Sequence, residues 1–156
     1  VLGVLVWKLF RTPGRRAPLS WTIWGAGWMV LLGLWLAALA PARAVLAFHL
    51  VSLGGFGPLV LGIATRVVVT HGGYPAGDEN RVLHWGIVGA VVLALIFRVA
   101  SEIFPHDGAR FYAAGGASWI LGWVAWCWNA IPRMVRRAGK PIVPDDHPQR
   151  ILLQRR

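Results

Sequence analysis

Apolar residues form four long stretches along the chain, near residues 20–39, 44–69, 82–104 and 112–132. Each stretch is long enough to cross about 30 Å of hydrocarbon as an α-helix, which takes about 20 residues. Membrane β-strands alternate apolar and polar residues over about ten positions, and these stretches do not. The pattern therefore predicts an all-α, polytopic transmembrane helical bundle with four spans.

The two ends of the chain differ from these stretches. Residues 1–8 are apolar up to a basic turn, which predicts the end of a preceding span whose beginning is missing. Residues 133–156 are rich in proline and in charged side chains. We expect them to form a cytoplasmic basic tail near the lipid headgroups, after a transmembrane domain over residues 1–132.

The composition excludes a soluble globule, since 56% of the residues are hydrophobic and only 14% are charged. The 16 Lys and Arg exceed the 6 Asp and Glu, giving a net charge of +10. These cations concentrate in alternate loops and in the tail, so the positive-inside rule places those loops and the C-terminus in the cytoplasm. We expect contact with membrane lipid and none with nucleic acid.

Five ionisable side chains lie in the predicted spans, where each costs about 2.5–3.5 kcal/mol at mid-bilayer. They are His49, Arg66, His84, Arg98 and Glu102. In the third span, His84, Arg98 and Glu102 fall on one helical face, which must turn toward protein or water. Arg98 and Glu102 are four residues apart, which predicts a structural ion pair. The alternative is a polar lining for a ligand or a cofactor propionate.

Small residues recur every four positions in the second span, at Gly54, Pro58 and Gly62. Such a row lets another helix approach closely, and Pro58 is expected to bend the helix or free a backbone carbonyl. Gly122 belongs to a similar row in the last span. These rows predict tight helix packing.

Three histidines are candidate ligands. His49 lies on a different face of the second span from the small-residue row. Its imidazole could form a hydrogen bond to another helix, or it could be an axial ligand of haem or copper. His71 and His84 bracket a glycine-rich loop that could bring the two imidazoles together. Two histidines are too few for a closed metal site, so further ligands would have to come from elsewhere.

A resemblance to a known family covers residues 44–134. It lies in three segments, FHLVSLGGFGPLVLGIATRVVVTHGG, then RVLHWGIVGAVVLALIFRVASE, and a last helix that ends in PRM. Together they resemble the C-terminal third of the NnrS family, which consists of larger bacterial inner-membrane proteins associated with denitrification and nitrosative stress. The resemblance implies that the protein binds haem and copper. The functional positions that the resemblance implies in this chain are His49, Arg66, His71 and Arg98.

The leading hypothesis is a haem- and copper-binding inner-membrane protein of nitric oxide metabolism or nitrosative-stress resistance. In it, His49 and His71 are the implied metal ligands, while Arg66 and Arg98 neutralise propionates or position anions. Two alternatives stay open, a structural or assembly subunit of a larger membrane complex and a membrane transporter. The expected protein partners are amino-terminal helices of a longer chain or another membrane subunit.

Overall fold

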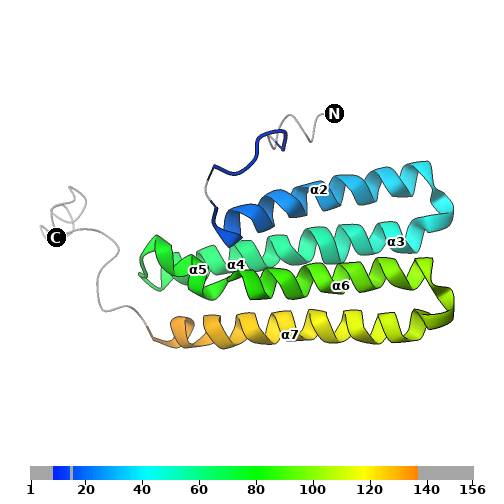
Figure 1. Cartoon of the computed structure of the whole chain (residues 1–156). Helices are drawn as coiled ribbons and strands as arrows, with labels where there is room; N and C mark the ends of the chain where they lie inside the picture. The colour runs from blue at the N-terminus through cyan, green and yellow to red at the C-terminus, as the bar shows by residue number, and fades with distance from the viewer. Residues whose placement is uncertain (1–8, 15, 137–156) are drawn as a thin grey trace, which may run out of the picture.

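The computed structural model describes residues 9–14 and 16–136, and the regular elements of this part are all helical. Its long helices form four rods that lie side by side and alternate in direction (Figure 1). The predicted stub at residues 1–8 and most of the predicted tail lie outside the described residues. In chain order the elements are α2 (Pro18–Leu39), η1 (Pro41–Arg43), α3 (Ala44–His49), η2 (Leu50–Phe56), α4 (Gly57–His71), η3 (Ala76–Asp78), α5 (Glu79–Val82), α6 (Trp85–Ile103), η4 (Pro105–Asp107) and α7 (Gly108–Val135).

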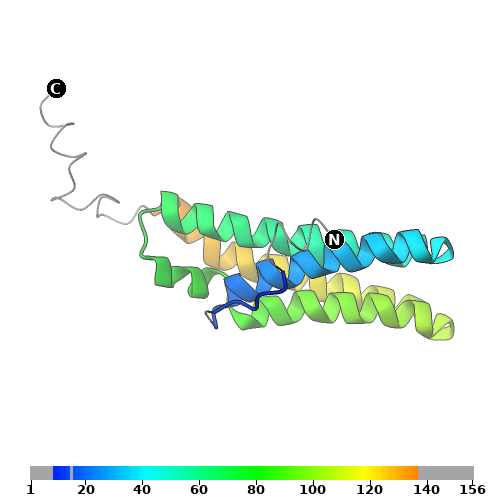
Figure 2. The same ribbon diagram turned by 90° about the horizontal axis from the view of Figure 1, so that it is seen from above.

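The bundle has two distinct ends, which both views show (Figures 1 and 2). At one end, η1 joins α2 to α3 and η4 joins α6 to α7. We call this the His49 end. The α4–α6 connection, the start of α2 and the last turns of α7 lie at the other end, which we call the His71 end.

The second rod is continuous through α3, η2 and α4, and its middle part is π-helical. Pro58 has no N–H and cannot donate to the carbonyl of Gly54, four residues earlier. Just before it, the N–H of Gly57 donates to the carbonyl of Ser52, five residues earlier, which is the π-helical pattern. The disturbance predicted from Pro58 therefore takes the form of a π-helical segment.

Glycines allow α2 to lie close against this second rod. A Cβ atom added to Gly33 would lie 2.6 Å from Val51 Cγ2, and one added to Gly55 would lie 2.5 Å from Val30 Cγ2. A Cβ atom on Gly62 would be 3.1 Å from Ile23. Larger residues at these positions would push the two helices apart.

The apolar core lies toward the His71 end and joins α4, α6 and α7. Leu61, Ile87 and Ala130 are among its most buried members. One hydrogen bond crosses this core, from Trp126 Nε1 to Thr65 Oγ1 at 2.8 Å. The Thr65 hydroxyl in turn donates to the carbonyl of Leu61 at 2.7 Å, so the polar atoms of this buried pair are satisfied.

Three of the four predicted spans are long and apolar enough to cross a membrane. They are Pro18–Leu39, Pro41–His71 and Trp85–Ile103. The fourth, α7, has 28 residues but is less apolar than these three, because glycines, tryptophans, Arg110 and Asn129 interrupt its aliphatic residues. The prediction of four spans is therefore supported by length and composition for three. The helix also extends to Val135, three residues beyond the predicted end of the last span at residue 132.

The third span begins later than predicted, and His84 is not part of its helical face. The chain forms a short separate helix, α5, and the backbone at His84 is extended, with φ −97° and ψ 166°. His84 is the N-cap of α6, because its Nδ1 accepts a hydrogen bond from the N–H of Gly86 at 3.1 Å. The predicted stripe therefore holds for Arg98 and Glu102 alone.

Candidate functional site

A pocket of about 170 Å³ at the His49 end brings together two of the predicted site residues, His49 and Arg98. They come from different rods, His49 from α3 and Arg98 from α6. The other lining residues are mainly aromatic and small side chains from η2, α6 and α7: Leu53, Ala94, Phe111, Tyr112, Gly115, Gly116 and Trp119.

One ring nitrogen of His49 has no hydrogen-bond partner among the described residues. Its Nδ1 lies 2.6 Å from the carbonyl oxygen of Val45. A carbonyl can only accept, so Nδ1 carries the proton, and the neutral ring has its lone pair on Nε2. This is the arrangement found in histidines that bind metals, where a hydrogen bond to one nitrogen orients the ring and leaves the other to ligate.

Arg98 is held in place from two directions. Its side chain is only 5% exposed, and its Nη2 donates to Glu102 Oε1 at 3.1 Å, within the ion pair expected from their spacing. Nη1 donates to the hydroxyl of Ser101, and the guanidinium carbon lies 3.9 Å from the ring centroid of Tyr112. This last contact is a cation–π interaction between α6 and α7.

One donor of Arg98 is unused within the described part of the chain. Its Nε is buried and has no hydrogen-bond partner there. A buried donor without a partner is costly, and a charged one more so. Arg98 therefore has one guanidinium nitrogen, Nε, without a hydrogen-bond partner among the described residues, and it lies beside a pocket that His49 also lines.

The α6–α7 hairpin explains why Tyr112 meets Arg98, a contact that was not predicted. Each residue lies seven positions from Pro105 in the connecting turn, so an antiparallel hairpin brings them level. Gly115 allows the close approach, because a Cβ atom there would lie 3.2 Å from the carbonyl oxygen of Ala94. Equal distance from the turn was the sequence signal that could have identified Tyr112.

The other predicted site residues lie toward the opposite end of the bundle. Arg66, on α4, is 62% exposed and pairs with Glu79 Oε1 at 2.5 Å. His71 is exposed in the last turn of α4. His84 is also exposed, and the nitrogen that could ligate a metal already caps α6.

His49 and His71 cannot share one metal ion. They lie on the same continuous rod, 22 residues apart, which corresponds to roughly 30 Å along a helix. In residues 9–14 and 16–136, no group of three or more His, Cys, Asp or Glu side chains could hold a metal ion. The structure does not bring the predicted ligands into one multi-histidine centre within this region.

These features define a helical membrane protein whose bundle holds a histidine- and arginine-lined pocket at one end. A comparison with protein families then identifies the particular group. The model of the family described as NnrS protein matches residues 1–137, and the chain belongs to this family. Searches of curated proteins and of solved structures gave no match.

Proposed function

We propose that this protein binds haem at the His49 end of the bundle and takes part in nitric oxide metabolism or in resistance to nitrosative stress. Membership of the NnrS family supports the haem and nitric oxide assignment. The observation that carries the choice of site is the free Nε2 of His49 in the same pocket as the buried Arg98.

The residues of this pocket fit part of a haem site. His49 could offer an imidazole nitrogen to a haem iron, and Arg98 could offer a cation to its propionates. Aromatic side chains such as Phe111 and Trp119 provide apolar walls for a porphyrin. When bound, haem would supply an iron that takes up nitric oxide. The chain's own contribution is to orient the imidazole, hold the guanidinium and limit the access of water.

The same residues do not fit a copper centre. Copper sites in proteins draw on several histidine, cysteine or methionine ligands, and His49 has no second such ligand in the pocket. His71 lies at the far end of the rod. Copper, which the family resemblance implied, is therefore not assigned to the described part of this chain.

The membrane arrangement that we propose has four spans, with α7 as the fourth. Its support is that α7 packs along the whole of α6 and exposes Ile120, Leu121, Val124 and Ile131. The positive-inside rule favours a cytoplasmic His71 end, which carries Arg66, Arg81 and Arg133. The same rule then puts the C-terminus in the cytoplasm of a bacterial inner membrane and the His49 pocket toward the outer face. Membrane lipid would contact the exposed aliphatic side chains.

A structural subunit and a transporter were the alternatives. The small-residue rows that suggested a subunit are used inside this chain, because Gly62 faces α2 and Gly122 faces α6. The π-helical segment before Pro58 is buried against α2 at Gly54 and Gly55, and no described ionisable side chain lines the pocket beside it. We therefore keep haem binding as the proposed function.

The test is an absorption spectrum of the full-length protein in detergent, oxidised and reduced with dithionite, with iron and copper analysis of the same sample. We expect a Soret band that shifts on reduction and on addition of nitric oxide. His49→Ala should remove this band, because His49 is the only histidine among the described residues that line the pocket, whereas His71→Ala should leave it unchanged.

Each of the two histidine variants serves as the control for the other. A band lost in His71→Ala and kept in His49→Ala would contradict the site, and a folded helical protein without iron would contradict haem binding itself. Far-UV circular dichroism of both variants shows whether the fold is intact.

A further inference from the structure

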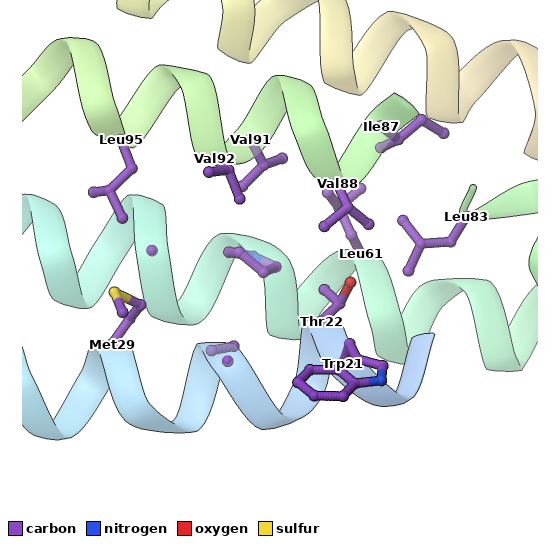
Figure 3. A pocket seen from close by; sticks show the side chains of 14 residues that line it. Trp21, Thr22, Met29, Leu61, Leu83, Ile87, Val88, Val91, Val92 and Leu95 are labelled. Atoms are coloured by element: carbon purple, nitrogen blue, oxygen red, sulfur yellow. The ribbon is translucent and has the colours of Figure 1, made fainter. Parts of the chain in front are cut away.

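A second pocket lies within the membrane-crossing part of the bundle and is separate from the His49 pocket. Its volume is about 210 Å³, and α2, η2, α4 and α6 contribute its walls (Figure 3). No residue lines both pockets. An apolar cavity of about 150 Å³ is large enough to hold benzene, so this one can hold a substituted six-membered ring.

The walls of this second pocket are almost entirely apolar. Val88, Val91 and Leu95 of α6 face Met29 of α2 across it, and the ring of Trp21 lies at one side (Figure 3). Such walls favour a neutral ligand and exclude an ion, because no described charged side chain lines the pocket to compensate the desolvation of a charge.

One buried polar side-chain atom without a partner lies in this apolar lining. The hydroxyl of Thr22 is buried, in a residue that is only 7% exposed, and it has no hydrogen-bond partner among the described residues. In Figure 3 the oxygen points from α2 toward the space beside Leu61. A threonine in a helix ordinarily donates to the carbonyl four residues earlier, as Thr65 does here to Leu61. Thr22 therefore offers an unused donor inside an apolar pocket.

The route into the pocket indicates where a ligand would come from. The pocket is partly open, and its walls belong to the three helical rods that are long and apolar enough to span a membrane. A ligand that enters between membrane-crossing helices comes from the lipid phase, so it must itself dissolve in the membrane. A lipid acyl chain meets this requirement but leaves the Thr22 hydroxyl unpaired.

We propose that this pocket binds the head group of a membrane quinone. A quinone ring is planar, neutral and apolar over its faces, and it carries a carbonyl oxygen at each end. One carbonyl would accept the hydrogen bond of Thr22, the ring would lie beside Trp21, and the isoprenoid tail would leave through the opening into lipid. The site does not depend on the haem proposal, because it shares no lining residue with the His49 pocket.

The test is a titration of the full chain in detergent with a benzoquinone that carries a ten-carbon tail. Isothermal titration calorimetry measures the binding. Thr22→Val keeps the shape of the side chain and removes the donor. It should weaken quinone binding about three- to tenfold, the value of one neutral hydrogen bond. Binding of tetramethylbenzene, a ring without carbonyl groups, should be unchanged or tighter.

A pair of glycine variants tests the location. Gly25 lines the pocket and Gly89 does not, and a Cβ atom at either position meets no other atom within 4 Å. Gly25→Leu should abolish binding, while Gly89→Leu should bind like the wild type. Equal binding by all variants would show partitioning into detergent only and overturn the proposal. An equal loss of quinone and tetramethylbenzene in Thr22→Val would overturn it as well.

Thermal unfolding gives a readout that does not need the calorimeter. Without quinone, Thr22→Val should unfold at the wild-type temperature or above, since it removes an unpaired buried hydroxyl. Added quinone should raise the unfolding temperature of the wild type more than that of Thr22→Val. An equal rise in both proteins would contradict a role for the hydroxyl.

Discussion

The two ends of the bundle carry similar residue types but use them differently. At the His49 end, Arg98 is buried, pairs with Glu102 across one helical turn, and lies in one pocket with His49. At the His71 end, Arg66 is largely exposed, and its partner Glu79 comes from the short α5 helix. Histidine and arginine in a predicted span were therefore not enough to define a site.

The difference lies in which atoms remain free. The Nδ1 of His49 forms a hydrogen bond with the carbonyl of Val45 in its own helix, so Nε2 remains available. The accepting nitrogen of His84 instead caps α6. The charged groups of the His71 end also satisfy one another, as Asp78 does by pairing with both Arg81 and Arg133. That end holds the loop and the helices together, whereas the His49 end places an unused ligand atom in a pocket with a buried arginine.

The largest expected contrast in stability between the two ends comes from removing each arginine. Arg98→Met leaves Glu102 and Ser101 without a cation in a mostly buried position, and should lower the free energy of unfolding by about 2–3 kcal/mol. Arg66→Met removes an exposed ion pair and should cost less than about 1 kcal/mol. Unfolding in mixed detergent micelles measures both, and equal losses would contradict the distinction between the ends.

A smaller effect is expected from the aromatic face that covers Arg98. Tyr112→Leu removes the cation–π contact and should lower the free energy of unfolding by about 1 kcal/mol. Tyr112→Phe keeps the ring and should retain most of that energy. The same unfolding assay applies, and a phenylalanine variant as unstable as the leucine variant would assign the effect to the hydroxyl instead.

The sequence predicted the helical bundle well because long apolar stretches are a direct signal of membrane-crossing helices. It also predicted the ion pair between Arg98 and Glu102, from their four-residue spacing, and a disturbance of the helix at Pro58. The pocket was harder, because the meeting of His49 with Arg98 depends on which rods become neighbours. The break before α6 was missed because one extended residue, His84, interrupts an otherwise helical pattern.

The smallest effect tests the role of His84 as a cap. His84→Ala leaves the N–H of Gly86 without its acceptor and should lower the free energy of unfolding by about 0.5–1 kcal/mol. His84→Asn offers an oxygen at the same place and should restore most of the loss. His71→Ala is the matched change to an exposed histidine of the same end, and we expect it to alter stability by less than about 0.5 kcal/mol. If His84→Ala and His84→Asn both behaved like His71→Ala, the imidazole would not be acting as the cap. The accepting nitrogen of His84 would then be free for a ligand, and the contrast between His84 and His49 would no longer hold.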